Sequence, residues 1–152
     1  ARQLVKHEYL RMNEVSRRYV DETPEFFVPK VWRSRAEHKK QGSGDEEILD
    51  VVFDDGIGQS TKDAYEDLIV FCRQTYNAMI SNGVAPEQAR MVLPQAMMTT
   101  WWWSGSLDAF ANMYNLRSKE DTQKETREVV LAIGKIAEEY FPVGWRALVG
   151  QI

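Results

Sequence analysis

The chain has 152 residues, of which 43% are hydrophobic and 28% are charged, with a formal net charge of -4. This length is enough for one domain with a hydrophobic core, and the composition is that of a globular protein. The negative balance argues against a general nucleic-acid-coating protein, which needs a positive surface to displace counterions from phosphate. A small anionic ligand held by a few local arginines remains compatible with this charge.

Several further protein classes are excluded by what the sequence lacks. Cys72 is the only cysteine, so neither an intrachain disulfide nor a cysteine-based zinc site can form, and we interpret it as a small buried hydrophobe. No apolar stretch approaches the roughly 20 residues of a membrane span, and no signal-peptide pattern is visible, which predicts a cytoplasmic protein. The chain opens at Ala1, without a methionine and inside a helical pattern, so we expect a further N-terminal segment.

The first third of the chain predicts one helix, one strand and two irregular segments. Residues 1–10 predict a helix, because their apolar residues fall near one helical face: Leu4, Val5, Tyr9 and Leu10. The polar run 11–19 predicts a shaped loop. Residues 25–32, which are aromatic and β-branched with prolines as punctuation, predict a short edge strand. Residues 34–58 predict a long surface loop that carries a short strand or turn at ILDVVF.

Two long helices are predicted, over about 60–82 and about 119–140. Ser60 can cap the start of the first and Gly83 can end it, whereas Ser118 can cap the second. Each helix has an apolar stripe at helical spacing. The first stripe consists of Leu68, Ile69, Cys72, Tyr76, Met79 and Ile80. The second consists of Val129, Val130, Ile133, Ile136, Ala137 and Tyr140.

Three shorter elements are predicted between the long helices. A short helix begins at Pro86 and ends near Leu93, residues 97–106 predict a strand, and residues 107–117 predict another helix. Helices therefore dominate, with two or three strands. The sequence predicts an α+β fold, a helix-rich single domain with a small, mostly antiparallel sheet.

A dense group of polar side chains near the N-terminus is the first candidate for a binding site. Its members are Gln3, Lys6, His7, Arg11, Asn13, Glu14, Ser16, Arg17 and Arg18. A guanidinium offers a planar fork of donors suited to phosphate, and amides and hydroxyls suit a base edge or a sugar. The alternative is a solvated, charged turn. Arg90 and Arg117 each stand at an element boundary, where an arginine is either part of an anion site or an ordinary ion-pair partner.

Other motifs give weaker evidence for a binding or catalytic function. In the WWW run at 101–103, alternate residues of a strand face opposite sides, so we favour core packing and an oligomer contact over base stacking. His7 and His38 are too isolated to predict a metal site. Glu14 is a candidate base, or a ligand to a ring N–H, with a capping role as the alternative. There is no phosphate-cradling glycine motif and no serine or cysteine triad.

The stretch KHEYLRMNEVSRRY resembles the signature of the flavin-dependent thymidylate synthases, a pattern of the form RHRxxSxNxxSxRY. The matching residues are His7, Asn13, Ser16, Arg18 and Tyr19, and Gln3 before them also fits. A second block resembles the family at Arg90, Leu93, Pro94, Thr99, Asn112, Leu116 and Arg117. Gln123 and the long helix after it are similar to the family's ending. The resemblance implies a thymidylate synthase-complementing fold, with residues 1–152 corresponding to the C-terminal two-thirds of such an enzyme.

The resemblance also implies an activity. The family makes dTMP from dUMP, with methylenetetrahydrofolate as the methylene donor, reduced FAD as the hydride source and NADPH as the usual reductant of the flavin. Its members are homotetramers whose active sites lie between subunits. The implied dUMP contacts are Gln3, Glu14, Ser16, Arg17 through its backbone, Arg18, Arg90 and Arg117. Ser16 and Arg117 are the candidate catalytic residues, although Ser16 has no adjacent base in sequence and is not predicted to be a nucleophile.

The implied FAD contacts are Lys6, His7, Glu8, Asn112 and Asp121, and this part of the pattern is the less complete one. The family's two arginines beside the histidine are Lys6 and Glu8 here, its first serine is Arg11 and a later histidine is Asp121. An asparagine and an arginine of the second block are replaced by Ser106 and Asp108. Carboxylates in place of cationic groups repel a pyrophosphate. The alternative is therefore a pyrimidine-nucleotide-binding relative that has lost FAD and uses another cofactor or acts as a partner subunit.

Overall fold

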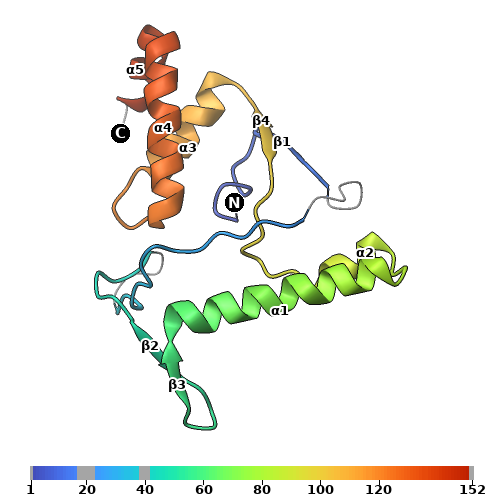
Figure 1. Cartoon of the computed structure of the whole chain (residues 1–152). Helices are drawn as coiled ribbons and strands as arrows, with labels where there is room; N and C mark the ends of the chain where they lie inside the picture. The colour runs from blue at the N-terminus through green and yellow to red at the C-terminus, as the bar shows by residue number, and fades with distance from the viewer. Residues whose placement is uncertain (1, 17–22, 38–41, 151–152) are drawn as a thin grey trace. The chain divides into compact units, whose positions relative to one another are not determined.

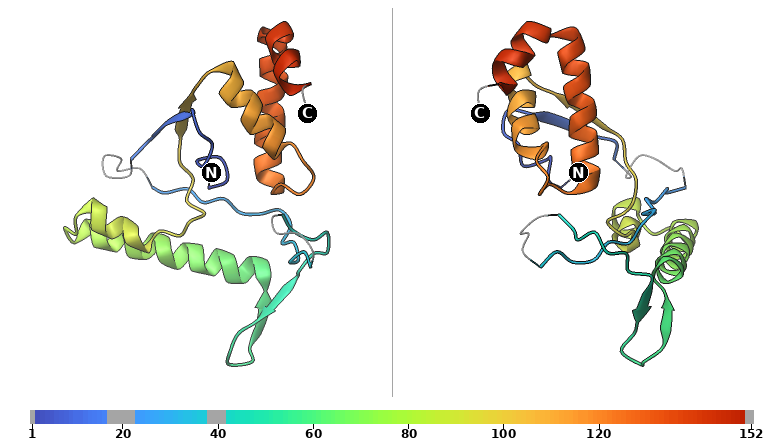
Figure 2. Two further views of the ribbon diagram at one scale, coloured as in Figure 1. Left: turned by 180° about the vertical axis from the view of Figure 1, so that it is seen from behind. Right: turned by 90° about the vertical axis from the view of Figure 1, so that its left-hand side faces the viewer.

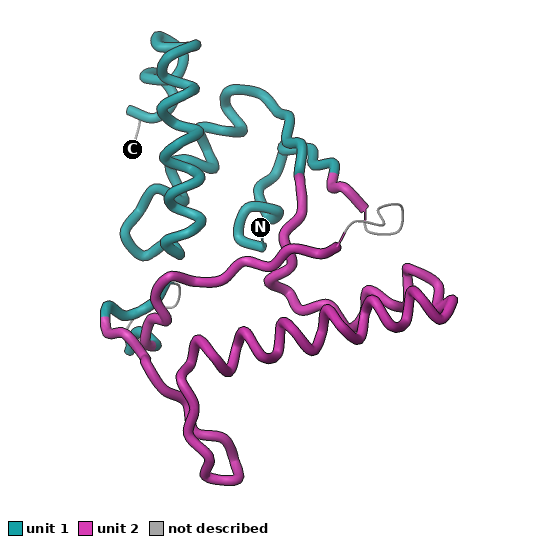
Figure 3. The backbone as a smooth tube through the Cα atoms, in the orientation of Figure 1, with its two compact units in different colours: residues 1–13, 35–45, 101–152 teal, residues 14–34, 46–100 magenta. Residues whose placement is uncertain are grey.

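The computed structural model describes residues 2–16, 23–37 and 42–150 (Figure 1). The chain divides into two compact units, each held together by its own internal contacts (Figure 3). Unit 1 comprises residues 1–13, 35–45 and 101–152, and unit 2 comprises residues 14–34 and 46–100. Helices combined with small two-stranded sheets confirm the predicted α+β class. The expectation of a single domain stays a prediction.

Three helices form the framework of unit 1: α3 (Leu107–Arg117), α4 (Lys124–Tyr140) and α5 (Pro142–Val149). Each packs against the other two (Figure 2). The Oγ of Ser106 caps α3 by accepting from the Ala109 amide at 3.2 Å, and Pro142 occupies the first turn of α5, where a missing N–H costs nothing. Two apolar clusters form the core, one from Leu4, Leu10, Ala109, Met113 and Val130, the other from Ala111, Ala137 and Trp145.

Unit 1 also holds most of a two-stranded sheet, in which β1 (Arg11–Glu14) pairs with β4 (Trp101–Ser104). Trp101 and Trp103 lie half-buried with ring centroids 6.0 Å apart, whereas Trp102 is 75% exposed. This alternation is the one expected of a strand. It confirms that only two of the three tryptophans share a face.

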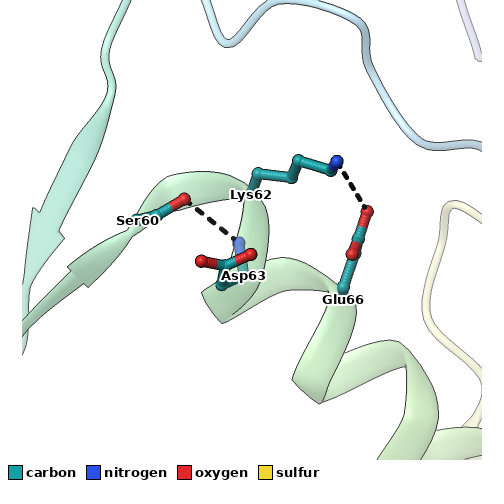
Figure 4. Close-up of polar contacts among 4 residues, drawn as sticks. All are labelled: Ser60, Lys62, Asp63 and Glu66. Carbon is teal, nitrogen blue, oxygen red and sulfur yellow. Dashed lines mark hydrogen bonds and ion pairs between the residues drawn. The ribbon is translucent and has the colours of Figure 1, made fainter.

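Unit 2 is built around α1 (Thr61–Ser81) and an antiparallel hairpin of β2 (Asp50–Val52) and β3 (Gly58–Ser60). As Figure 4 shows, the Ser60 Oγ accepts from the Asp63 amide at 3.4 Å, and Lys62 pairs with Glu66 at 3.7 Å. The helix ends before Gly83, whose φ of 82° lies in the left-handed region that favours glycine. The predicted bounds of this helix are confirmed to within one residue.

Two short helical segments follow in unit 2, α2 (Pro86–Ala89) and the 3-10 helix η1 (Arg90–Val92). The sequence predicts a single short helix over this range, and the structure divides it into these two. Residues 25–34 are irregular, with a bend at Lys30 and Val31, and hydrogen-bond to two other segments. The Phe27 amide donates to Ala96 at 2.9 Å, and the Ile48 amide donates to Trp32 at 2.7 Å. Only isolated bridges form, so the predicted edge strand is wrong as a regular strand. Pro29, which has no N–H, interrupts the pairing.

The predicted helix at residues 1–10 is wrong, because the described residues 2–9 form turns. Two features of this segment distinguish it from a helix. The Gln3 carbonyl accepts a hydrogen bond from Arg117, and Tyr9 has a φ of 64°, which no right-handed helix accommodates. The predicted loop at 11–19 is wrong over Arg11–Glu14, which forms β1 by pairing with β4. Tertiary pairing overrides the polar character of this stretch.

The second long helix begins at Lys124 and not near 119, because Ser118 ends α3 instead of starting α4. Parts of both predicted stripes face solvent: Leu68, Val129, Ile136 and Tyr140 are between 49% and 69% exposed. Cys72, predicted to be buried, is only half-buried. Helix α5 was not predicted. No helix of the described chain is both long and apolar enough to cross a membrane.

Candidate functional site

A cavity of about 520 Å³ in unit 1 is lined by the N-terminal turn, the end of α3 and the residue before α4. Its lining residues are Arg2, Gln3, Val5, Lys6, Arg117 and Gln123. Three of these side chains are cations, and no acid is found among the described residues of the lining. A cavity with three positive charges and two amides is suited to an anionic group with hydrogen-bonding neighbours, such as a phosphate ester.

The N-terminal turn presents its polar residues to this cavity because its apolar residues are anchored in the core. Leu4 and Leu10 are both 8% exposed and belong to the main apolar cluster of unit 1. The His7 amide donates to the Leu4 carbonyl at 3.1 Å, which closes the turn. With Leu4 fixed in the core, Gln3 and Lys6 lie at the cavity.

Arg117, the last residue of α3, connects this turn to the helix. Its Nε donates to the Nε2 of His7 at 3.1 Å, and its Nη2 donates to the Gln3 carbonyl at 3.5 Å. Helix α3 is anchored by Met113, which is fully buried. A cation also suits the negative end of a helix dipole. The guanidinium is therefore held by its helix and by two acceptors of the N-terminal turn.

His7 accepts through Nε2, so its neutral form carries the proton on Nδ1. Burial lowers the pKa of His7 below its ordinary value, and the positive charge of Arg117 lowers this pKa further. The imidazole therefore contributes an acceptor at neutral pH and no positive charge. The structure brings Gln3, Lys6, His7 and Arg117 together, four residues that the sequence singled out.

The other predicted dUMP contacts that the structure describes belong to unit 2. Glu14 is exposed at the end of β1, and Ser16 is half-buried two residues later. Between them, the Val15 amide donates to the Thr100 carbonyl at 3.0 Å, which keeps this stretch extended. Arg90 is exposed, and its Nε donates to the Glu87 carbonyl at 3.3 Å. Arg17, Arg18 and His38 lie outside the described residues.

The residues expected to contact FAD fit a flavin nucleotide only in part. Lys6 lines the cavity, so together with Arg2 and Arg117 it is suited to a phosphate group. Glu8 is exposed, and the Asn112 amide donates to the carboxylate of Asp108 at 3.4 Å. At Glu8 and Asp108 the chain has carboxylates where the family pattern has cations.

Asp121, the remaining expected FAD contact, does not line the cavity either. It is exposed in the loop between α3 and α4, and Gly42 lies against its backbone. A Cβ on Gly42 would come within 3.1 Å of the Asp121 carbonyl oxygen, and the φ of 90° at Gly42 also favours glycine. Asp121 thus lies against Gly42 through its backbone and is not among the residues that line the cavity.

Arg2 is the cation of the lining that the sequence did not single out. In the helix predicted over residues 1–10, Arg2 lies away from the apolar face. Its position directly before Gln3 was the available signal, but only the turn brings it to the cavity. Among the described residues, no cluster of three or more His, Cys, Asp or Glu side chains is arranged to hold a metal ion.

A second cavity of unit 1, of about 350 Å³, has a different chemistry. It is lined by apolar side chains that include Trp101, Trp103, Phe110 and Met113. The indole N–H of Trp101 is buried and has no hydrogen-bond partner among the described residues. With no cation in its lining, this cavity is not suited to a phosphate, and the cation-lined cavity is the candidate site.

Comparison with known proteins identifies a family and several relatives of this chain. The family described as "Thymidylate synthase complementing protein" matches residues 1–143. Proteins named "Flavin-dependent thymidylate synthase" from Aquifex aeolicus, Kosmotoga olearia and Thermus thermophilus are 42%, 33% and 33% identical over 135, 146 and 151 residues. These matches cover 88%, 96% and 97% of this chain, respectively.

The same matches cover 40%, 61% and 51% of the three relatives, so the chain spans about half the length of the curated proteins it resembles. The family match takes in the whole N-terminal turn, both arginines at element boundaries and all of α3 and α4. It confirms the resemblance that the signature residues His7, Asn13 and Ser16 indicate. The chain belongs to the family of thymidylate synthase complementing proteins.

Proposed function

We propose that this chain binds dUMP and serves in the methylation of its C5, with methylenetetrahydrofolate as the carbon donor. The observation that carries the proposal is the arrangement around Arg117, whose guanidinium is held by His7 and Gln3 at the edge of a cation-lined cavity. All three residues stand at positions of the family signature. The names of the relatives, "Flavin-dependent thymidylate synthase", support the same reaction class.

The residues of the cavity have distinct tasks in this proposal. Arg117 provides a fixed positive charge for the phosphate or for a uracil carbonyl on which negative charge develops, and Gln3 provides an amide for hydrogen bonding. Arg2 and Lys6 attract the nucleotide and balance its charge. Ser16, Glu14 and Arg90, which belong to unit 2, are further substrate contacts that we propose from the family signature. Their task is positioning, which lowers the barrier by fixing the reacting groups before reaction.

The hydride source that we propose is reduced FAD, with NADPH as the reductant of the flavin. When bound, the flavin would supply the hydride that converts the transferred methylene into a methyl group. Among the described residues expected to contact FAD, Lys6 lines the cavity together with Arg2 and could hold a flavin phosphate. His7, the residue after Lys6, would contribute indirectly, by accepting the hydrogen bond from Arg117.

We further propose that copies of the chain associate as a homotetramer with active sites between subunits, and that α1 carries one contact surface. Leu68 and Phe71 of this helix are 52% and 67% exposed. They lie three residues apart and therefore on neighbouring positions of one helix face. Large apolar side chains exposed side by side are typical of a surface that another protein covers.

Calorimetric titration of the purified chain with dUMP, combined with visible absorption of the protein as purified, tests the proposed function. We expect dUMP binding that Arg90→Ala abolishes and Arg117→Ala weakens to a still measurable level, and a flavin absorption band that survives gel filtration. Lys119→Ala, an exposed cation beyond the cavity, serves as the matched control and should leave binding unchanged. Unchanged dUMP affinity in both arginine variants would refute the site. Colourless protein that binds dUMP and not added FAD would favour the flavin-free alternative.

A further inference from the structure

We infer that His7 is a positioning residue: its neutral imidazole, with the proton on Nδ1, holds the guanidinium of Arg117 in the orientation that presents it to the ligand of the cation-lined cavity. The identity of that ligand as dUMP rests on the proposed function. The His7–Arg117 contact itself does not, because it is a feature of the free chain.

The geometry of the contact assigns the role. An arginine side chain has four rotatable torsions and five N–H donors, so two anchoring bonds, one at Nε and one at Nη2, fix the plane of the whole fork. Here Nε donates to His7 at 3.1 Å and Nη2 donates to the Gln3 carbonyl at 3.5 Å. Both acceptors belong to the N-terminal turn, and Arg117 lines the cavity as well. The turn thus fixes the orientation of the guanidinium before any ligand arrives.

The chemistry of position 7 explains why a histidine suits this role. The residue must accept from a guanidinium, which excludes a cation, and it must not neutralise Arg117, which excludes a carboxylate. A neutral imidazole satisfies both conditions. Half-burial and the charge of Arg117 lower the pKa of His7, which keeps the ring neutral at physiological pH. Lys6 and Glu8 flank His7 in its own segment, and Arg117 faces it from α3.

Fixing a long side chain in advance increases affinity, because the ordering cost of that side chain is not incurred on binding. Loss of the His7 acceptor should therefore weaken ligand binding about fivefold to tenfold, on the order of the cost of ordering one such side chain. It should not abolish binding, since the positive charge of Arg117 remains. This intermediate effect separates a positioning residue from a direct ligand contact.

Nitrogen-15 NMR of the unliganded chain tests the contact without any assumption about function. We expect the His7 ring in the form with a protonated Nδ1 and an unprotonated Nε2, and an Arg117 Nε–H signal protected from exchange with water. His7→Gln, which keeps an acceptor at similar reach, should retain much of that protection, whereas His7→Met should lose it. A protonated Nε2 in the wild-type ring, or an unprotected Arg117 signal, would overturn the inference.

A thermodynamic cycle with dUMP tests the consequence. His7→Met should weaken dUMP binding about fivefold to tenfold, His7→Gln should stay within about twofold, and His7→Met should have no further effect when added to Arg117→Ala. Equal weakening by His7→Met in both backgrounds would overturn the positioning role. Exposed Glu120, in the loop after α3, offers Glu120→Gln as a control that leaves affinity unchanged.

Different results would contradict the proposed substrate site and the positioning role of His7. If Arg117→Ala leaves dUMP affinity unchanged, the proposed substrate site is wrong, and the NMR signals of His7 and Arg117 still decide whether the contact exists. If Arg117→Ala weakens binding while His7→Met does not, the substrate site stands and the positioning role is wrong. Circular dichroism of each variant identifies any that fail to fold. If His7→Met fails to fold, the inference is tested by the tautomer of the His7 ring in the wild-type chain and by the dUMP affinity of His7→Gln.

Discussion

Gly134 of α4 lies directly against the ring of Tyr114 of α3, so that a Cβ at position 134 would come within 2.8 Å of the Tyr114 Cδ2. The same ring meets Trp145 of α5 edge-on, with centroids 5.3 Å apart. Tyr114 therefore contacts both neighbouring helices of unit 1. The absence of a side chain at Gly134 sets how closely α3 and α4 approach.

Gly134→Ala is expected to destabilise the chain by about 1 to 2 kcal/mol. Overpacking a filled core costs about 1–3 kcal/mol, and the better helix propensity of alanine offsets up to about 1 kcal/mol of this. Urea unfolding followed by circular dichroism measures the difference. When Tyr114 is first shortened by Tyr114→Leu, the same glycine substitution should cost less. A stabilising Gly134→Ala would show that the two helices can move apart freely.

Ser60→Ala is expected to reduce stability by about 1 kcal/mol, because it removes the hydroxyl that accepts from the Asp63 amide at the start of α1. Lys62→Ala, two residues further on, provides the matched comparison. It breaks only the exposed ion pair with Glu66, which contributes about 0.5 kcal/mol or less. Chemical denaturation of both variants tests the order, and a larger loss in Lys62→Ala would contradict it.

The long elements of the fold were predictable because their signals are local. A capping serine and a glycine in the left-handed region bound α1, and the apolar periodicity of residues 107–117 predicted α3. The failures occurred where a distant partner decides the backbone. Residues 11–14 are polar and form a strand only because β4 pairs with them. Ser118, a good cap in isolation, serves the end of α3 rather than the start of α4.

The candidate site was predictable at the level of residue types, and much less so at the level of its geometry. The signature marked Gln3, His7 and Arg117, although 110 residues separate the last two in the chain. No local pattern predicts that an arginine at a helix end will donate to a histidine so distant in sequence. The position of Arg2 was equally unpredictable, because Arg2 lines the cavity only through a turn that forms where the sequence predicts a helix.

The stability of the chain should decrease as pH falls through about 6.5, and part of this decrease should disappear in His7→Gln. Folding lowers the pKa of His7 through burial and the charge of Arg117, so in this range the unfolded chain binds more protons than the folded chain. The contribution of His7 is complete above the unfolded pKa and is lost progressively down to the folded pKa. Denaturation of both proteins between neutral and mildly acidic pH provides the difference curve. A difference that is flat with pH would contradict the lowered pKa.

Phe71→Glu is expected to disrupt self-association, because it places a charge in the centre of the exposed apolar face of α1, where Phe71 is 67% exposed. Light scattering with size-exclusion chromatography would show the loss as a shift to a smaller species. Asn77→Asp adds the same charge at an exposed position of α1 that lies nine residues from Leu68, and so on the opposite side of the helix, and it serves as the control. An unchanged mass for Phe71→Glu would exclude this face as a contact between copies.

Arg2→Gln should weaken dUMP binding at low ionic strength, by about threefold to tenfold, and the effect should shrink as salt is added. Arg2 lines the cavity but is itself exposed, so its charge acts on an anionic ligand through a screened, solvent-accessible path. Arg117 is part-buried, and the effect of its removal should depend much less on salt. Calorimetry at two salt concentrations compares the variants. A salt-independent loss in Arg2→Gln would indicate a direct, desolvated contact with the nucleotide, and no loss at all would remove Arg2 from the site.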